Sequence, residues 1–418
     1  MKALVAVAHH AQIPNQAHVQ QDLCDLQMMP SMREAASRSL RILHIIGTTD
    51  PAAGGPSESL RVLMAFSGSG YQGEVVSLDD PSSPFLKDLP FPVHALGPER
   101  ISGCSLSLYK WLKKNSHRFD GFIINGVWDC CGVAVWLALL GRKPYMVFPH
   151  GMLDPYFKRQ FPLKHAKKWI FWLLAEYWVL RNAHRVLFTT KDESELAEQS
   201  FWLHRWDGQI VPFGTGPPPK NTGQLKVAFH ERCPELRGER FMLYLGRIHG
   251  KKGCDLLIRS FIKHASLDPQ LHLLMAGPDQ QGRSSSLQQE IADHQLTNRV
   301  HWPGMLKGDA KWGAFYASEA FILPSHQENF GIAVAEALSC GKAVLLTEKI
   351  NIAPEITLDG AGLMASDTQD GIDDLLLRWI EMPKLRRALM ERQAANTFQD
   401  RYNMEHNASS ILGLFNSL

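Results

Sequence analysis

Short apolar runs alternate with helical stretches along the chain, and this alternation limits the possible folds more than any other feature. Each run is bounded by glycine or polar residues, as is usual for a buried strand. The first five strands are expected at 42–47, 73–80, 120–128, 144–151 and 184–191. Helical patterns separate them, including those near 105–115, 131–141 and 163–182 and a helix capped by Ser57. Strands that alternate with helices indicate a parallel sheet covered on both faces.

A segment rich in proline and glycine interrupts this pattern at 211–223. Proline fixes φ and glycine frees it, so the segment is predicted to be a linker. The alternation then restarts, with strands expected at 240–248, 271–278, 300–304, 320–325 and 342–348. We therefore predict two doubly wound α/β domains facing an interdomain cleft. The predicted parts are an N-terminal extension at 1–40, a first domain at 41–212, a linker at 213–225, a second domain at 226–390 and a C-terminal helix at 391–418 that packs back on the first domain.

Composition excludes several classes of protein. Hydrophobic residues make up 45% of the chain and charged residues 21%, as in ordinary globular proteins. The formal net charge is only +2, so no nucleic-acid partner is expected. Seven cysteines without a CxxC pair indicate a reduced, cytoplasmic protein with neither a disulfide framework nor a zinc site. No apolar run reaches the roughly 18 residues of a membrane span.

The segment PSHQENFGIAVAEALSCG at 324–341 carries two glutamates around a predicted helix start. Glu328 lies in the loop after a strand, and Glu336 lies about two helical turns further on. A helix expected to begin near 329–330 would offer unpaired N–H groups to an anion, and Gly331 would allow a close approach. The two carboxylates would then suit the hydroxyl groups of a ligand. The alternative is a pair of glutamates with no ligand, one of them balancing the helix dipole.

A second strand end carries two cations. In LGRIHGKKGCD at 245–255, Arg247 and Lys252 leave a predicted strand and precede a helix. Two cations beside such a turn could neutralise a diphosphate. The spacing does not fit a Walker A loop, and no Ser or Thr follows the lysine. A solvated basic turn is the alternative.

Two weaker candidates lie in the first half of the chain. Gly54 and Gly55 precede a helix, which is typical of a loop that approaches phosphate. His150 follows a strand end and stands between Pro149 and Gly151. This position favours a functional role and a structural role equally. The match to G-x-G-x-x-G at 68–73 stands between a helix and a strand, the wrong order for a dinucleotide site. No metal site is predicted.

A basic and aromatic stretch at 157–181 resembles a surface helix. Such a helix can lie on an anionic membrane. The alternative is a helix that buries its tryptophans in the first domain. The stretch contains Lys158, Arg159, Lys164, Lys167, Lys168, Trp169, Trp172 and Trp178.

Taken together, these motifs resemble the family 4 retaining glycosyltransferases of the GT-B fold. The motifs are the GG loop, PHG at 149–151, GRIHGKKG, PSxxENFG with the paired glutamates, and PEI at 354–356. The resemblance spans about residues 41–390. The HGMLDP stretch with its Trp- and Lys-rich helix is also similar to bacterial exopolysaccharide and lipopolysaccharide transferases. The resemblance implies two Rossmann-like domains.

The resemblance also implies roles for the second-domain residues. Arg247 and Lys252 would bind the donor diphosphate, Glu336 the ribose hydroxyls and Glu328 the donor sugar. Sugar and phosphate would be held by three consecutive backbone N–H groups, those of Phe330, Gly331 and Ile332.

In the first domain, Gly54 and Gly55 would close over the diphosphate, and His150 would lie near the reacting sugar and the acceptor. The sequence departs from the family pattern at Asn329, where glycine is frequent. That difference bears on loop freedom and sugar choice.

The function that the resemblance implies is metal-independent hexose transfer, with retention, in cell-surface polysaccharide synthesis. The donor would be a nucleotide-diphosphate sugar, with UDP-glucose or a related UDP-hexose expected before GDP-mannose. No cofactor is expected. The acceptor would be a glycan or a lipid-linked saccharide, and the protein would be cytoplasmic and peripheral on the inner face of the membrane. Alternatives are a sugar-nucleotide epimerase of the same fold, a phosphorylase and a non-catalytic sugar-nucleotide-binding protein.

Overall fold

The structure is a computed structural model that describes residues 39–66, 71–97, 106–156, 158, 162–279 and 282–416. Both sheets lie in one compact unit, which begins at Arg41, one residue after the start of the first strand. The predicted extension at 1–40 lies outside the described residues, apart from Ser39 and Leu40, as do most of the glycine residues of the 68–73 match.

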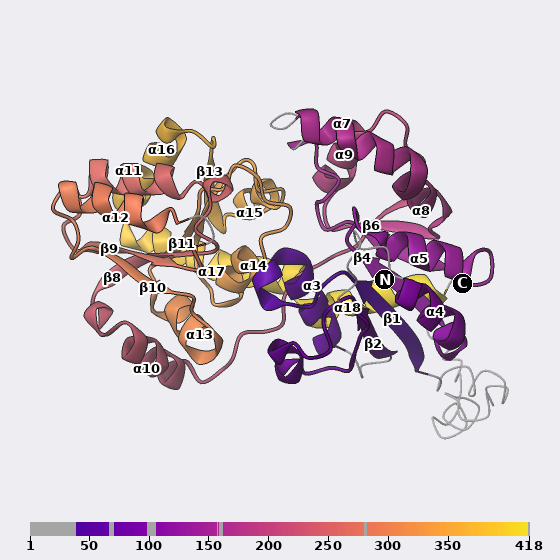
Figure 1. Cartoon of the computed structure of the whole chain (residues 1–418). Helices are drawn as coiled ribbons and strands as arrows, with labels where there is room; N and C mark the ends of the chain where they lie inside the picture. Colours follow the sequence, from indigo (N-terminus) through magenta and orange to yellow (C-terminus); the bar gives the residue numbers. More distant parts are fainter. Residues whose placement is uncertain are drawn as a thin grey trace, which may run out of the picture. The chain divides into compact units, whose positions relative to one another are not determined.

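The first sheet has seven strands in the order β3-β2-β1-β4-β5-β6-β7, and its described pairings are parallel. Its inner strands are continuous apolar runs because helices cover both faces. The strands are β1 (Leu40–Ile46), β2 (Tyr71–Ser77), β3 (Val93–Ala95), β4 (Gly121–Asn125), β5 (Tyr145–Phe148), β6 (Arg185–Phe188) and β7 (Gly208–Ile210). The helices are α3 (Gly55–Ala65), α4 (Leu106–Asn115), α5 (Cys130–Leu139), α7 (Pro162–Phe171), α8 (Tyr177–Asn182) and α9 (Lys191–Ser200) (Figure 1).

The second sheet has six parallel strands in the order β10-β9-β8-β11-β12-β13. They are β8 (Arg240–Leu245), β9 (Leu271–Ala276), β10 (Val300–Gly304), β11 (Ala320–Leu323), β12 (Val344–Thr347) and β13 (Gly362–Ala365). The helices of this half are α10 (Thr222–Arg232), α11 (Cys254–His264), α12 (Ser284–Asp293), α13 (Gly308–Ala317), α14 (Ile332–Ser339), α15 (Ala353–Leu358), α16 (Gln369–Ile380) and α17 (Lys384–Thr397). The predicted class, two parallel α/β sheets, is confirmed.

Some local expectations are wrong. The helix expected to be capped by Ser57 begins at Gly55 with Gly54 as its cap, and the Ser57 hydroxyl donates instead to the carbonyl of Thr48 (3.1 Å). The helix expected from 329–330 begins at Ile332, because Gly331 takes the left-handed conformation at φ 75° and caps it. Gly54 and Gly331, two predicted site residues, are therefore the N-terminal caps of their helices.

Two segments cross between the halves of the chain and pair with each other. The Thr215 N–H donates to the Tyr402 carbonyl (3.0 Å), and the Met404 N–H donates to the Thr215 carbonyl (3.0 Å). A Cβ on Gly214 would lie 1.8 Å from the Tyr402 oxygen, so this position requires glycine. The helix α10 begins at Thr222, inside the range expected to be a linker. The domain boundaries themselves stay predictions.

The last helix, α18 (Met404–Asn416), packs on the first half of the chain. A Cβ on Gly121 of β4 would lie 2.2 Å from the ring of Phe415, and Ile411 lines a small cavity with Ile42 and Leu63. Figure 1 shows α18 in yellow beside β1 and α3.

The cysteines only partly follow expectation. Cys131, Cys233 and Cys254 are free and buried, and Cys340 is free and half-buried. Cys130 is disulfide-bonded, so the expectation of an entirely reduced chain is wrong there. Among the described residues, no helix has both the length and the apolar character that a membrane crossing requires.

A π-helical turn at Trp172–Glu176 joins α7 to α8 and turns a carboxylate inward. Glu176 is only 1% exposed, and its carboxylate accepts a hydrogen bond from the Trp128 N–H (3.2 Å). Burial raises the pKa of Glu176 to about 8, Asp129 adds to the shift, and Lys168 opposes it. Trp128 itself stands at φ 76°, an uncommon conformation for a non-glycine residue.

This buried carboxyl predicts a pH-dependent stability. Folded Glu176 keeps its proton up to about pH 8, whereas unfolded glutamate releases it near its ordinary value of 4.5. The unfolded state therefore binds fewer protons across this window, and the free energy of unfolding should fall as pH rises through it. We expect Glu176→Gln to flatten this dependence and to raise stability at pH 8 by about 1 kcal/mol or more. Urea unfolding between pH 5 and 8 measures both effects.

Glu198 provides the matched control because it is exposed on α9. Glu198→Gln should leave the slope unchanged. A Glu176→Gln protein with the wild-type slope would show that Glu176 is ionised in the fold.

Candidate functional site

The candidate residues lie where strands of both sheets end. In the first half, the loops after β1 and β5 carry Gly54 and His150. In the second half, the loops after β8 and β11 carry Arg247 and Glu328. In open parallel sheets, ligands bind beyond these carboxyl ends.

Lys252 and Glu328 are in direct contact. The lysine ammonium donates to the glutamate carboxylate, and both side chains are largely buried. Burial, with Lys251 and Arg247 nearby, lowers the pKa of Lys252 to about 7, whereas the contact with Glu328 favours the charged ammonium. The pair therefore joins two predicted site residues from separate loops of the second sheet.

Gly253 explains how Lys252 reaches this place. The short 3-10 turn Gly250–Lys252 ends at Gly253, which has φ 64°. A Cβ there would lie 2.0 Å from the carbonyl oxygen of Pro324, just after β11. Only glycine lets the turn approach the β11 loop so closely, and this approach places Lys252 against Glu328.

Arg247 lies beside the glycine loop of the first half. A Cβ built on Gly54 would be 3.8 Å from the guanidinium carbon of Arg247, and nothing lies within 4 Å of the corresponding position on Gly55. Gly54 has φ 97° and caps α3, so the positive end of the α3 dipole faces the same region as Arg247. Two loops from different sheets thus bring positive potential to one place.

Glu336 is buried in α14 and pairs with a residue that the sequence did not single out. Its carboxylate accepts a hydrogen bond from the Lys311 ammonium (2.6 Å), and only 3% of Glu336 is exposed. Burial raises the pKa of Glu336, and Lys311 opposes that shift. Arg61 and Glu58 of α3 also act on Glu336 electrostatically, so the glutamate faces the helix that Gly54 caps. No sequence motif marks Lys311.

The three predicted N–H donors lie at the start of α14. The Phe330 side chain is buried against Phe213 and Tyr402, with ring centroids 5.3 and 5.7 Å away. Its role at the site is therefore limited to its backbone. Within the described parts of the chain, no hydrogen bond is found from the N–H groups of Phe330, Gly331 or Ile332. Unpaired N–H groups at a helix start are suited to an anion.

His150 stands at φ 50° after β5, with its ring stacked on Phe148 at 4.4 Å between centroids. Its Nε2 lies 3.2 Å from the Asn125 Oδ1. Burial and His44 lower the pKa of His150 to about 3, so the ring is neutral at neutral pH. The following residue, Gly151, donates its N–H to the buried Glu193 carboxylate (2.7 Å).

The loop that carries Glu328 also contacts the loop that carries His150. The Gln327 amide donates to Asp154 of that loop (3.0 Å), and the Asn329 amide donates to the Thr189 hydroxyl, directly after β6 (3.3 Å). A Cβ on Gly151 would lie 2.5 Å from the Asn329 Cβ. Asn329, the departure from the family pattern, therefore contacts the first half of the chain with an amide that glycine lacks.

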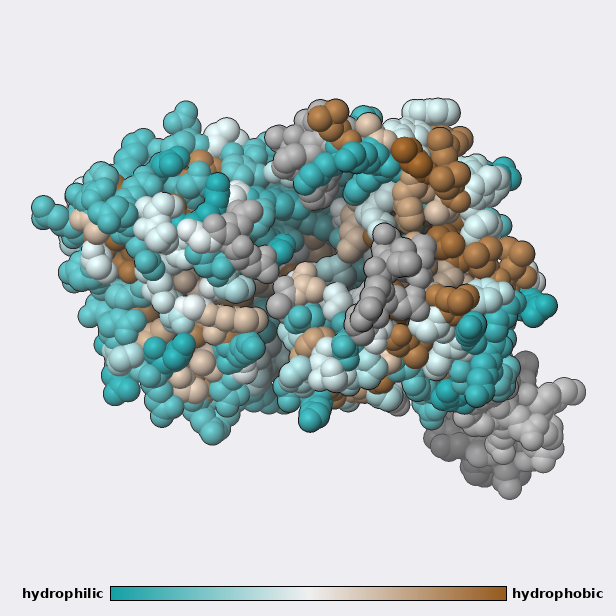
Figure 2. Space-filling view, in the orientation of Figure 1, coloured by the Kyte–Doolittle hydropathy of each residue, from teal (hydrophilic) through white to brown (hydrophobic). Residues whose placement is uncertain are grey.

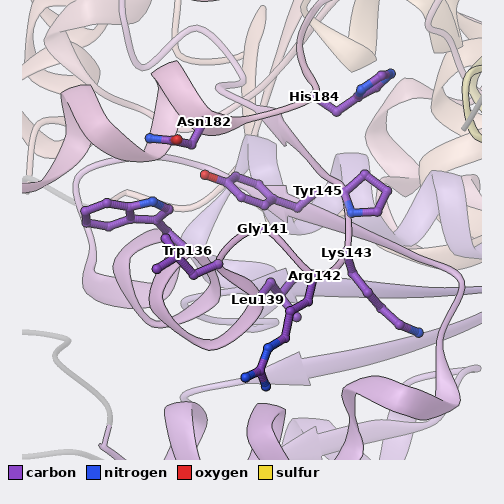
Figure 3. Close-up of a pocket in the computed structure, with 10 residues that line it drawn as sticks. Trp136, Leu139, Gly141, Arg142, Lys143, Tyr145, Asn182 and His184 are labelled. Atoms are coloured by element: carbon purple, nitrogen blue, oxygen red, sulfur yellow. The ribbon is translucent and has the colours of Figure 1, made fainter.

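A cavity of about 360 Å³ lies elsewhere (Figure 3). Its lining residues lie before β5 and β6 or at the first residue of β5, so the cavity is at the opposite end of these strands from His150. Figure 3 shows Arg142 and Lys143 extending away from Tyr145. The Lys143 ammonium is already bound by the carbonyls of Ser116 and Phe119. The cavity therefore contains none of the predicted site residues.

No cluster of three or more His, Cys, Asp or Glu suited to a metal is found in the described residues. Metal-independent chemistry stays a prediction.

Comparison with known families decides what kind of protein carries this site. A model described as "Glycosyl transferases group 1" matches residues 229–395, and a "Glycosyl transferase 4-like domain" model matches residues 54–214. Together the two matches cover most of the chain. The chain belongs to the GT4-type glycosyltransferases. The expected family and its GT-B fold are thus confirmed.

Individual relatives of this GT4-type chain are distant. Mannosylfructose-phosphate synthase from Agrobacterium fabrum is 23% identical over 57% of this chain and 55% of its own length. Lipopolysaccharide glucosyltransferase WaaG from Escherichia coli is 26% identical over 49% of this chain and 55% of its own. The chain spans about half the length of the curated relatives that it matches.

Solved structures agree on the fold. HepE from Anabaena, in a crystal structure with UDP and glucose, superposes with a TM-score of 0.73 at 18% identity. The match covers 91% of this chain and 100% of HepE. At this level of identity the likeness shows the GT-B fold alone.

Proposed function

We propose that this GT4-type chain transfers a hexose from a nucleotide-diphosphate sugar to a glycan or a lipid-linked saccharide, with retention at the anomeric carbon. The observation that carries the proposal is the convergence of Arg247, Lys252 and the α14 start with the buried Glu336 around the strand ends. Such a set suits a ligand with a doubly charged diphosphate and a ribose. HepE, a structural neighbour, was solved with UDP-glucose, which supports trying UDP-hexoses before GDP-mannose.

In the proposed reaction, an acceptor hydroxyl attacks the anomeric carbon while the bond from that carbon to the phosphate oxygen breaks. The nucleoside diphosphate leaves with the bonding electrons and takes the proton of the hydroxyl. Negative charge grows on the leaving group, and preorganised cations and N–H groups stabilise it. Arg247, Lys252 and the N–H groups of Phe330, Gly331 and Ile332 supply that field. Glu328 binds the sugar, and Gly54 and Gly55 close over the diphosphate.

A thermal-shift screen against nucleoside diphosphates and their sugar esters tests the proposal, because a bound ligand raises the melting temperature. We expect stabilisation by one base type, followed by transfer when an acceptor extract is added. Donor consumption without any acceptor would point to an epimerase. Binding without turnover on any acceptor would point to a silent binding protein.

We also propose that the acceptor is presented at an anionic membrane surface. Figure 2 shows apolar side chains gathered over α5, α7 and α8. This apolar surface consists of Leu137, Leu140, Leu163, Ile170, Leu173, Leu174 and Trp178. Two of the tryptophans expected to form it instead face inward, since Trp172 is fully buried and Trp169 packs on Phe201. Lys168 also turns inward, 4.1 Å from the ring of Trp128, whereas Lys158, Lys164 and Lys167 are exposed.

A vesicle assay tests this surface. Ile170→Glu with Leu174→Glu should lower partition onto phosphatidylglycerol vesicles at least tenfold, because each change removes an apolar contact and adds repulsion. Lys164→Glu with Lys167→Glu should do the same at low salt. Leu358→Glu is the matched control, since Leu358 is 84% exposed on α15, outside the surface. Equal partition of all four proteins would contradict the proposal.

A further inference from the structure

Asn125 lies at the end of β4 and is 2% exposed. Its side-chain nitrogen is 3.3 Å from the carbonyl oxygen of Ile123 and 3.5 Å from that of Ile45. Its Oδ1 is 3.2 Å from the Nε2 of His150. A carbonyl oxygen only accepts hydrogen bonds, so the amide NH2 must face the two carbonyls. The orientation of the Asn125 amide is thus fixed by the backbone of two strands.

This orientation decides which nitrogen of His150 carries the proton. The Asn125 Oδ1 is an acceptor, so the Nε2 of His150 must be the donor. A neutral imidazole has only one N–H, and the Nδ1 of His150 therefore carries a lone pair. Burial keeps the ring neutral, since the pKa of His150 is lowered to about 3. The other titratable group acting on this ring is His44, whose Nδ1 lies 3.5 Å from the Asn125 nitrogen.

The lone pair of His150 is open to a ligand. Among the described residues, no hydrogen bond to Nδ1 is found. The buried side-chain atoms without a partner do not include Nδ1, so this atom is accessible to solvent. Stacking on Phe148 with only 2° between the planes holds the plane of the ring, and the contact of Nε2 with the Asn125 Oδ1 selects the edge that faces β4. An accessible acceptor with a fixed direction therefore stands at the end of β5, in the loop that contacts the Glu328 loop through Gly151 and Asn329.

We propose that Asn125 is a positioning residue that holds His150 as the Nε2–H tautomer, so that Nδ1 accepts a hydrogen bond from a hydroxyl group of the bound donor sugar. The ligand half of this inference rests on the proposed function. The tautomer half stands on the geometry of β1, β4 and β5 alone. His150 accordingly acts as a hydrogen-bond acceptor and not as an acid.

Nitrogen-15 spectra of the histidine rings test the tautomer directly. The chain has 18 histidines, and the spectrum of His150→Gln identifies the signals of His150. In the wild type we expect a pyrrole-like Nε2 and a pyridine-like Nδ1. Asn125→Ala should give averaged signals from both tautomers. The matched control is Asn115→Ala, which also removes an amide bonded to a backbone carbonyl, that of Trp111, and should leave His150 unchanged.

Two outcomes would overturn the tautomer assignment. One is an Nδ1–H tautomer in the wild type, a result that needs no variant and therefore does not depend on whether Asn125→Ala folds. The other is an unchanged Nε2–H tautomer in a folded Asn125→Ala protein, which would show that Asn125 does not set it.

Calorimetry with UDP and UDP-glucose, and with GDP and GDP-mannose, tests the ligand half. Asn125→Ala should bind the free diphosphate as the wild type does and the sugar ester about tenfold more weakly, the scale of one hydrogen bond. Equal affinity of both proteins for the sugar ester would overturn the hydroxyl contact. A wild type that binds none of the four ligands would refute the proposed function and the hydroxyl contact, while the tautomer result would stand.

Discussion

Lys252→Ala is expected to lower the rate of sugar transfer by about 10²-fold or more, because it removes an ammonium donor that stabilises the negative charge of the departing diphosphate. Losing one preorganised donor of this kind costs a factor on that scale. Lys252 is held in place by the Gly253 turn and by Glu328, so the lost charge cannot be replaced by a mobile neighbour. The measurement is the initial rate of nucleoside diphosphate release, with the donor and acceptor that the screen identifies.

Lys263→Ala is the control for this prediction, since Lys263 is exposed on α11 and pairs with Asp373. It should transfer sugar at the wild-type rate. Arg247→Ala should resemble Lys252→Ala, whereas Lys252→Arg should recover part of the rate by restoring the charge. A folded Lys252→Ala protein with near-normal turnover would defeat the assignment of Lys252 to the diphosphate.

Glu336→Ala is expected to weaken binding of the nucleoside diphosphate by about 10²-fold. Hydrogen bonds from ribose hydroxyls to a carboxylate are charge-assisted and contribute roughly 1.5–3 kcal/mol. Isothermal calorimetry with UDP and GDP measures the loss. Inorganic diphosphate is the second probe, because it has no ribose and should bind this variant as it binds the wild type.

Glu336→Ala also leaves Lys311 unpaired in a largely buried place, which can destabilise the fold. Glu336→Ala combined with Lys311→Met removes both charges and keeps the binding test valid. An equal loss of affinity for inorganic diphosphate and for the nucleotide would place Glu336 at the phosphates. No loss for either would remove it from the site.

The sequence predicted the sheets well because most strands are apolar runs bounded by glycine, proline or polar residues. It missed β3, β7 and β13, and the physical reason is clear for β7. This strand has three residues, all of them exposed at the edge of the sheet, so no apolar run marks it. The start of α14 was placed too early because helix periodicity does not reveal that Gly331 turns left-handed.

The candidate site was predictable in part, because several of its residues stand in recognisable motifs next to predicted strands. Arg247, Lys252, Glu328 and Glu336 stand in motifs at strand ends, and topology brings strand ends together. Lys311 could not be found in this way, because it lies on a helix without a motif and becomes relevant only through its contact with Glu336. Asn125 was hidden for the opposite reason: an asparagine ending an apolar strand shows nothing until His150 is seen beside it.

The central claim is that the strand-end cations and Glu336 hold the nucleotide of a sugar donor. A crystal structure with UDP soaked into one crystal and GDP into another tests it most directly. The account predicts a diphosphate within hydrogen-bonding distance of Arg247, Lys252 and the start of α14, with its ribose on Glu336. A nucleotide bound away from these groups, or no bound nucleotide in either crystal, would contradict it.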